Sequence, residues 1–194
     1  MSERVRILSV EPLSHCWARL DRYTIRYIRR DGSVDTLVRE VHDHGHGATV
    51  LPYDKANGTV LLVRQFRLPV QIYGEDGFIL EACAGLLDGN DPAECARREA
   101  EEELGFRLWN LRQVASTFMT PGAVTEHLTM FLADYSHGGR ISEGGGHAHE
   151  GEDIEVVEMP FDQLRGMMQR CEIVDAKTVI LIMFLERELG LPPL

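Results

Sequence analysis

The chain has 194 residues, of which 44% are hydrophobic, and a formal net charge of −11 at neutral pH. This length predicts one main folded domain with room for a small appended module, because single cores commonly serve roughly 100–200 residues. The acidic balance argues against binding to nucleic acid or to an anionic membrane, since both partners need a basic protein surface. We therefore expect the acidic side chains to have a local role.

The first residues and the cysteines indicate the compartment. The start, MSERVRILSV, is too charged for a secretory signal, and no run approaches the roughly 18 apolar residues of a membrane-spanning helix. The four cysteines are widely separated and form no CxxC pair, so reduced thiols are expected rather than a disulfide framework. These features predict a cytoplasmic protein.

The first third of the chain has the alternating pattern of β-hairpins. Residues 23–41 alternate on either side of Asp31-Gly32, a dipeptide that favours a tight hairpin turn. A second hairpin is predicted over residues 48–66, with Asn57-Gly58 as its turn and Pro52 suiting an edge strand. We expect an N-terminal β module over residues 1–45 and the main domain over residues 46–194.

The middle of the chain alternates strands with one acidic helix. Residues 78–87 predict one strand, and residues 93–104 predict a helix, with Pro92 in its first turn and Gly105 as its C-cap. Two further strands, residues 111–119 and 126–135, are joined by a turn at residues 120–123.

The last third begins with a Gly- and His-rich loop over residues 136–153. Its lack of periodicity leaves two interpretations, an active-site flap or a disordered connector, and we favour the flap. A strand at 154–160 and a helix at 161–170 are expected to follow. Asp175 is a suitable N-cap for a last helix, which we expect to be buried because its centre, VILIMFL, is apolar on all sides.

The predicted acidic helix concentrates negative charge at its carboxyl end. Glu99, Glu102 and Glu103 share one face, whereas Glu101 points elsewhere. Each like-charged pair costs roughly 0.2–0.5 kcal/mol, and the helix dipole disfavours acids in the last turn. Two interpretations remain open: a solvated acidic surface, or a site for a hard divalent cation such as Mg²⁺ or Mn²⁺.

The segment GLLDGNDPAECARREAEEELGF, residues 85–106, resembles the Nudix box, a loop–helix motif of hydrolases that cleave nucleoside diphosphates linked to another moiety. Its second half, from Arg98 to Gly105, matches the motif in residue type and spacing. The first half is one residue shorter than the family pattern, with Asn90 or Asp91 where the family has a glutamate.

Further landmarks resemble the nucleoside-diphosphate-sugar branch of this family, in particular the enzymes that hydrolyse GDP-mannose. They are Val41-His42-Asp43, Ala48-Thr49, residues 63–67, residues 81–87, Thr120-Pro121-Gly122 with Glu126, Gly144-Gly145-Gly146, and residues 152–155. The resemblance implies an α/β/α sandwich with a mixed sheet, plus a small antiparallel N-terminal β module that supports a homodimer.

The implied reaction is hydrolysis of a nucleotide sugar, with GDP-mannose giving GMP and mannose 1-phosphate. The alternative substrate is ADP-ribose, giving AMP and ribose 5-phosphate. An interpretation of another class is a Nudix-like sensor that binds nucleotides without turnover. Such domains generally show a damaged helix, whereas Arg98, Glu99, Glu102 and Glu103 are all present here.

The resemblance also implies residue roles. Mg²⁺, or alternatively Mn²⁺, would be held by Glu99, Glu103, the carbonyl of Ala84 and Glu152, with Arg98 and Glu102 assisting catalysis. Glu152 would also be the general base, with Glu150 and Glu143 as alternatives. The implied substrate contacts are Arg67, Glu81, Pro121, Glu126 and Lys177.

Two of these regions can also be judged from spacing alone. Arg64 and Arg67, three apart on the predicted strand, would face opposite sides, so only one can enter a given pocket. His42, His44 and His46 form an HxHxH pattern, but the neighbouring glycines predict a turn and no fourth ligand is evident, so zinc is not favoured.

Overall fold

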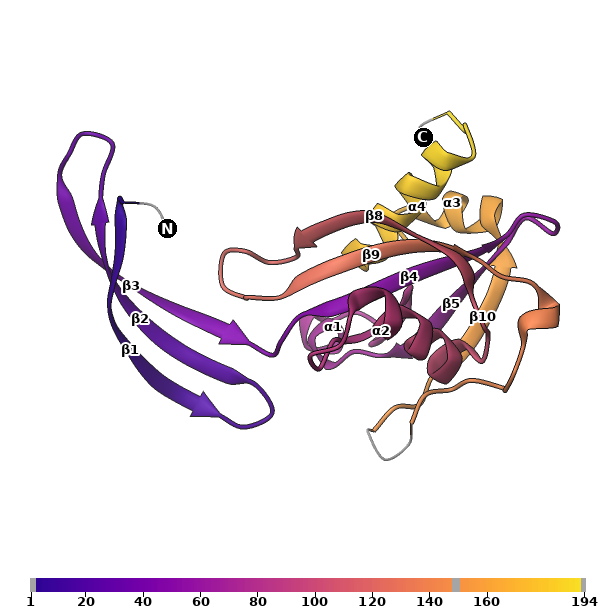
Figure 1. Ribbon diagram of the computed structural model, residues 1–194, viewed down its shortest axis with the longest axis horizontal. Helices are drawn as coiled ribbons and strands as arrows, with labels where there is room; N and C mark the ends of the chain where they lie inside the picture. Colours follow the sequence, from indigo (N-terminus) through magenta and orange to yellow (C-terminus); the bar gives the residue numbers. More distant parts are fainter. Residues whose placement is uncertain (1–2, 148–150, 193–194) are drawn as a thin grey trace. The chain divides into compact units, whose positions relative to one another are not determined.

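The computed structural model describes residues 3–147 and 151–192 (Figure 1). The chain divides into two compact units, Met1–His46 with Phe118–His127, and Gly47–Thr117 with Leu128–Leu194. The domain boundary between residues 45 and 46 stays a prediction. The first unit also includes Phe118–His127, which the sequence did not indicate.

The first unit contains a three-stranded antiparallel sheet. Its strands are β1 (Val5–His15), β2 (Arg19–Ile28) and β3 (Val34–Asp43), in the order β1-β2-β3. The hairpin predicted around Asp31-Gly32 is confirmed, with Ile28 paired to Val34 and Gly32 at a positive φ of 87°. Asp31 does not have a positive φ, so the turn is not the tight one with two left-handed residues that the dipeptide favours. Every residue of β1, the strand that the sequence left undefined, is exposed.

The second unit is built around a seven-stranded mixed sheet. Its order is β10-β5-β4-β9-β8, with β6 paired to β5 and β7 paired to β4. Strands β4 and β9 run parallel, whereas β4 is antiparallel to β5 and β7, and β5 is antiparallel to β6 and β10. The strands are β4 (Gly47–Asp54), β5 (Thr59–Phe66), β6 (Phe78–Glu81), β7 (Cys83–Leu86), β8 (Trp109–Phe118), β9 (His127–Asp134) and β10 (Glu155–Pro160).

The position of strand β4 differs from the edge position that Pro52 predicts. The strand is central and every residue in it is buried, so the edge position predicted for Pro52 is wrong. A proline is tolerated here because β4 changes partner at this point: Val50 pairs with β7, Tyr53 pairs with β5, and neither antiparallel ladder includes residue 52.

The strand predicted over residues 78–87 is interrupted at Ala82. Its first half, β6, pairs with β5, and its second half, β7, pairs with β4. The main-chain N–H of Ala82 instead donates to the hydroxyl of Thr178 at 2.7 Å. The sequence could not reveal this break because its partner lies 96 residues away.

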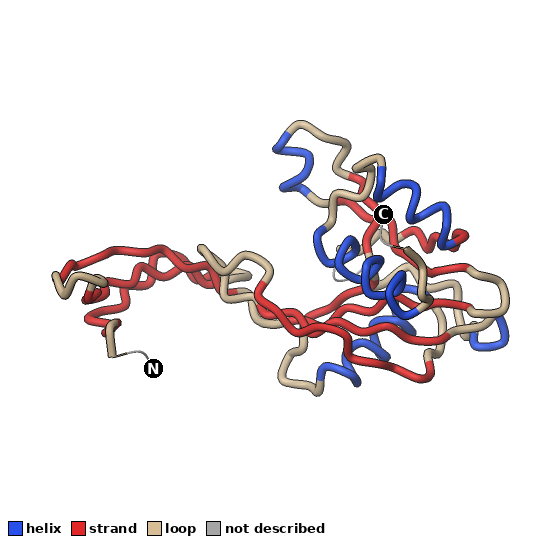
Figure 2. The backbone as a smooth tube through the Cα atoms, turned by 90° about the horizontal axis from the view of Figure 1, so that it is seen from above, coloured by secondary structure: helices blue, strands red, loops and turns tan. Residues whose placement is uncertain are grey.

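Helices cover both faces of the large sheet (Figures 1 and 2). The helices are α1 (Leu68–Tyr73), α2 (Pro92–Glu99), the π-helical turn η1 (Ala100–Leu104), the 3₁₀ turn η2 (His137–Gly139), α3 (Phe161–Gln169) and α4 (Ala176–Glu188). The sandwich of the predicted fold class is confirmed, although α1 was not predicted.

Helix α4 is only partly buried. Leu181, Ile182 and Leu185 are fully enclosed, but Met183 is 57% exposed, so the prediction of a helix buried on all sides is wrong. One apolar flank of α4 therefore faces outward. Among the described residues, no helix is long and apolar enough to cross a membrane.

Candidate active site

The acidic segment begins with a capped helix. Asp91 is the N-cap of α2, and its carboxylate accepts from the main-chain N–H groups of Ala93 and Glu94 at 2.9 and 3.2 Å. Asn90 closes the preceding turn by donating to the carbonyl of Leu87 at 2.9 Å. Asp91 thus caps the helix, and Asn90 closes the loop before it.

The end of the helix is wider than an α-helix. The helix predicted over residues 93–104 is present, but its last turn, η1, has π-helical hydrogen bonding. Gly105 ends it with φ 78°, as predicted for the C-cap. The widened turn carries Glu102 and Glu103, so the two carboxylates project from a non-standard part of the backbone.

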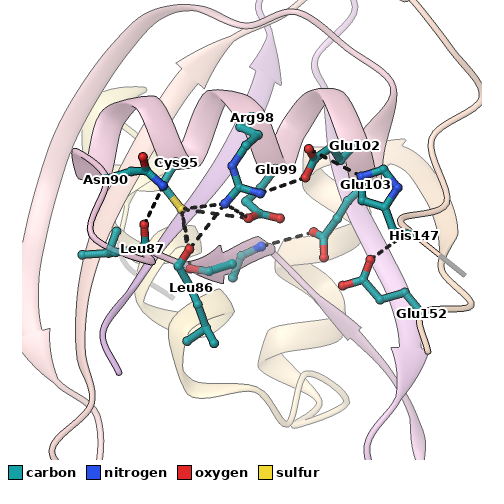
Figure 3. A network of polar contacts seen from close by, with 12 residues as sticks. Leu86, Leu87, Asn90, Cys95, Arg98, Glu99, Glu102, Glu103, His147 and Glu152 are labelled. Carbon is teal, nitrogen blue, oxygen red and sulfur yellow. Dashed lines mark hydrogen bonds and ion pairs between the residues drawn. The ribbon is translucent and has the colours of Figure 1, made fainter. Parts of the chain in front are cut away.

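One guanidinium group lies between two of the three acids (Figure 3). Arg98 contacts Glu99 through Nη2 at 2.6 Å and Glu102 through Nη1 at 3.0 Å. Its Nη2 also donates to the carbonyl of Leu86 at 3.4 Å. Arg98 therefore neutralises part of the charge on the helix and ties it to strand β7.

Glu103 is the most enclosed of the three acids, with only 2% of the residue exposed. Its Oε2 accepts from the N–H of Ala84 at 3.3 Å. Burial, together with the charges of Glu99 and Glu152, raises the pKa of Glu103 to about 7, although contacts with Cys83 and Ala84 partly offset this. A carboxylate that is costly to ionise here would be stabilised by a cation.

Two cysteines and a glycine pack against Glu99 and Glu103. Cys83 is hydrogen-bonded to Glu103, and burial raises the thiol pKa well above its ordinary value. The Cys95 sulfur lies 4.0 Å from Glu99 Oε1. Gly85 is required by close approach, because a Cβ there would lie 2.0 Å from the same oxygen. Both thiols are free, as predicted.

A glycine-rich segment, residues 144–147, packs on the π-helical turn η1, which carries Glu102 and Glu103 and is called the acidic turn below. Gly145 and Gly146 donate their N–H groups to the carbonyls of Glu103 and Glu102, at 2.8 and 3.1 Å. Glu152 Oε2 accepts from the N–H of His147 at 2.8 Å, so its carboxylate lies beside Glu103 (Figure 3). Residues 144–147 and 152 of the predicted loop are thus attached to the acidic helix, while its role as a flap stays a prediction.

A second buried charge cluster lies near the acidic turn. Glu81, 2% exposed, accepts from Arg67 Nε and Nη2 at 2.7 and 2.9 Å and from Lys177 Nζ at 2.6 Å. Burial alone would raise the pKa of Glu81, but these two cations outweigh it and hold the pKa below its ordinary value. Lys177 also donates to Asp175 at 2.9 Å.

Arg67 connects this cluster to the acids, since the charge of Glu103 is among the influences that raise the pKa of Arg67. Strand β5 ends at Phe66, so the prediction that Arg67 lies on the same strand as Arg64 is wrong. Arg64 instead lines a cavity of about 450 Å³ with Phe78, Asp153, Ile154 and Glu155. Arg67 therefore belongs to the Glu81 cluster, whereas Arg64 belongs to this cavity.

The remaining predicted residues belong either to the loop that follows β9 or to the first unit. Glu143 pairs with Arg140 at 2.6 Å and is exposed, while Glu150, the other alternative base, lies outside the described residues. Pro121 and Glu126 belong to the first unit. There, Glu126 lies 3.9 Å from His44, which stacks on Trp17, and His46 accepts from the N–H of His127 at 3.3 Å.

The donor set around Glu103 fits a hard divalent cation in chemistry. All candidate ligands are oxygens, and Arg98 pairs with two of the three carboxylates, Glu99 and Glu102, while Glu103 accepts from the Ala84 N–H. As the side chains lie, however, no group of three His, Cys, Asp or Glu residues in the described ranges converges closely enough to bind an ion. Binding of an ion through these carboxylates would therefore require their oxygens to move closer together.

The chain matches the models of two known protein families. The NUDIX domain model matches residues 43–179, and the model of the GDP-mannose pyrophosphatase NudK N-terminal domain matches residues 4–42. The chain belongs to the NUDIX family. Its acidic turn is thus the segment that the sequence resemblance assigned to the Nudix box, and the family is one of hydrolases.

Similar proteins cover almost the full chain. A GDP-mannose pyrophosphatase of Pectobacterium atrosepticum is 45% identical over 94% of both chains, and one of Escherichia coli K12 is 42% identical over 96% of this chain and 97% of its own. A crystal structure of an ADP compounds hydrolase superposes with a TM-score of 0.75 over 97% of this chain and 95% of its own. At 18% identity, this likeness supports the NUDIX fold only.

Proposed function

We propose that the protein hydrolyses the diphosphate bond of a nucleoside diphosphate sugar, with GDP-mannose giving GMP and mannose 1-phosphate. The proposal rests on the end of the acidic helix, where Glu99, Glu102 and the buried Glu103 lie together and Glu152 lies beside Glu103. It rests also on the similarity of almost the whole chain to GDP-mannose pyrophosphatases. The buried acids supply a place for a cation, and a diphosphate is the substrate group that a cation and arginines recognise.

NUDIX hydrolases generally need a divalent metal, and we propose Mg²⁺, with Mn²⁺ as the alternative. Glu99, Glu103 and the carbonyl of Ala84 would hold it, with Glu102 assisting. The cation, when bound, neutralises diphosphate charge and promotes ionisation of the attacking water. Arg98, which is tied to the carbonyl of Leu86, would keep the carboxylates of Glu99 and Glu102 oriented.

Glu152 is the proposed general base. Its carboxylate lies beside Glu103, and its contact with the His147 N–H holds it at the edge of the acidic turn. Glu143 is occupied by Arg140 on the exposed side of the loop, which disfavours it as the base. The proton of the attacking water would pass to a Glu152 oxygen.

Arg67 and Lys177 are the proposed diphosphate contacts, with Glu81 orienting both. Arg67 keeps part of its side chain exposed, 42%, although Glu81 binds two of its nitrogens. We further propose roles for Pro121 and Glu126 in substrate binding, as the resemblance implies. A planar guanidinium group offers paired donors to phosphate oxygens. Glu81, which the resemblance also implies as a substrate contact, would act through the two cations that it binds.

The test is a comparison of kcat/KM with Mg²⁺ for GDP-mannose, GDP-glucose, ADP-ribose and ADP-glucose. GDP-mannose should be hydrolysed with the highest kcat/KM, and both products should appear in equal amounts. Preference for ADP-ribose would favour the alternative pyrophosphatase activity. Binding of a nucleotide sugar without hydrolysis of any member of the panel would favour the sensor.

We also propose a homodimer that uses the first unit. Strand β1 exposes Val5, Ile7, Leu8 and Val10, more apolar surface than one edge strand normally leaves in water. Sedimentation should show a dimer that the substitution Ile7→Lys weakens, whereas Arg6→Lys on the same strand should not. A monomeric wild type would reject this arrangement. The cytoplasmic location stays a prediction.

A further inference from the structure

His147 lies between two of the acids that the proposed reaction uses. Its main-chain N–H donates to Glu152 Oε2 at 2.8 Å, and its ring Nε2 lies 3.5 Å from Glu102 Oε1 (Figure 3). One residue of the glycine-rich segment thus contacts both the proposed base and the π-helical turn. No role was assigned to His147 by its sequence pattern.

The contacts of Glu102 explain how the ring can act. Its other oxygen, Oε2, is bound by Arg98 at 3.0 Å, and its main-chain carbonyl accepts from Gly146 at 3.1 Å. Arg98 is tied in turn to the carbonyl of Leu86. Arg98 and Gly146 therefore restrain Glu102. A contact between the His147 ring and Glu102 restrains the glycine segment, residues 144–147, in turn.

Apart from this ring, main-chain hydrogen bonds join the segment to the turn, from Gly145 and Gly146 to the carbonyls of Glu103 and Glu102. Gly144, Gly145 and Gly146 have φ values of 69°, 105° and 71°, and glycine pays a large entropic cost when it is ordered. A Cβ at Gly146 would lie 2.3 Å from Glu152 Oε2, so the absence of a side chain there makes room for the carboxylate. The adjacent histidine ring supplies the side-chain contact that the glycines lack.

We propose that His147 is a positioning residue: its ring, held on Glu102, fixes the glycine segment so that the His147 N–H keeps Glu152 beside Glu103. The inference rests on the proposed role of Glu152 as the base. It differs from a merely structural role, because the ring is 43% exposed and its removal leaves no buried cavity.

The experiment compares His147→Ala, His147→Gln and His137→Ala with the wild type. Gln can offer a donor near the position of the ring Nε2. His137 is the matched control, since its Nε2 lies 3.3 Å from Glu158, a residue of β10, and its ring is 63% exposed. Hydrogen exchange of residues 144–152 in the metal-free protein reports the tether without turnover.

We expect faster exchange of this segment in His147→Ala, an intermediate rate in His147→Gln, and the wild-type rate in His137→Ala. With Mg²⁺ and GDP-mannose, kcat of His147→Ala should fall about 10-fold with KM within about threefold, because a displaced base affects the reaction step more than binding. His147→Gln should recover most of the loss.

Unchanged exchange in His147→Ala, or faster exchange with an unchanged kcat, would overturn the proposal. Glu152→Gln, measured in parallel, separates this failure from that of the base assignment. Wild-type turnover in Glu152→Gln would reject Glu152 as the base, and with it the purpose of the tether. Loss of turnover in Glu152→Gln with normal kcat in His147→Ala would reject only the role of His147.

Discussion

Glu81 and Glu103 are the same residue type, each is 2% exposed, and both lie in the second unit, yet their pKa values move in opposite directions. Glu81 is surrounded by Arg67 and Lys177, which keep it ionised. Glu103 has the Ala84 N–H, the Cys83 thiol and two neighbouring carboxylates. Burial alone therefore does not decide the charge of a carboxylate; the cations that the chain places beside it do.

The difference separates a carboxylate that is neutralised by its own cationic neighbours from one whose surroundings can receive a cation. The Glu81 cluster contains its own counter-ions and fixes β6, α1 and α4 to one another through Arg67 and Lys177. The Glu103 cluster leaves negative charge partly uncompensated. That cost is tolerated in a protein where binding of a divalent cation and a diphosphate can offset it.

Removal of the charge on Glu81 should have the largest effect on stability. Glu81→Gln removes the carboxylate charge that Arg67 and the buried Lys177 share; Lys177 keeps Asp175 and Arg67 is partly exposed, so the free energy of unfolding should fall by about 3 kcal/mol, the lower end for a broken buried pair. Urea denaturation measures this. Glu172→Gln, which removes an exposed carboxylate from its Arg170 pair, is the control and should leave the unfolding midpoint unchanged. Equal midpoints for both variants would refute a structural role for the Glu81 cluster.

Removal of the charge on Glu103 should instead act mainly on turnover. Glu103→Gln should lower kcat/KM about 10²–10³-fold, because the proposed cation loses a buried ligand. Glu101→Gln is the matched control, since Glu101 is exposed and pairs with Arg107 at 3.5 Å; its kcat/KM should stay within about twofold. Substantial unchanged hydrolysis by Glu103→Gln would contradict the metal assignment.

The stability of the metal-free protein should depend on pH through Glu103. Its folded pKa of about 7 lies above the ordinary 4.5, so the folded state binds the proton more tightly and stability falls as pH rises from about 4.5 through 7. With chelator present, Glu103→Gln should exceed the wild type by roughly 1–3 kcal/mol at pH 8.5 and match it near pH 4.

Adding Mg²⁺ should change the difference in stability between the wild type and Glu103→Gln. A cation that binds only the folded state should stabilise the wild type more than Glu103→Gln, which reduces or reverses the difference at pH 8.5. Thermal or urea unfolding at both pH values is sufficient. If the two proteins have parallel pH profiles without metal, the cost of ionising Glu103 is absent.

The smallest expected effect comes from the glycine that gives room to Glu152. Gly146→Ala places a Cβ against Glu152 Oε2 and should lower kcat about 10-fold. Gly190→Ala introduces a similar positive-φ strain, at φ 67°, with no atom within 4 Å of the new Cβ and far from the acidic turn in sequence. Steady-state kinetics on both variants separate displacement of the carboxylate from backbone strain, and equal kcat values would exclude the displacement.

The sequence by itself determined the elements and the acid-rich motif. Periodicity and turn residues located the hairpins at Gly32 and Gly58, the acidic helix with Gly105 at its end, and the helix capped by Asp175. These features depend on neighbours within a few residues, so local preference is sufficient. The NUDIX resemblance rested on the same stretch, because its spacing is fixed by one loop and one helix.

Only the tertiary structure decided which of those charges meet. It divided residues 78–87 between two strand partners and made β4 central despite Pro52. It also brought Arg67 and Lys177 to Glu81, from which they are 14 and 96 residues away in the sequence. It also placed His147 on Glu102 and Glu152 beside Glu103. The reason is physical: burial and the pairing of distant side chains set the energy of a charge, and neither is encoded in the local spacing of residues.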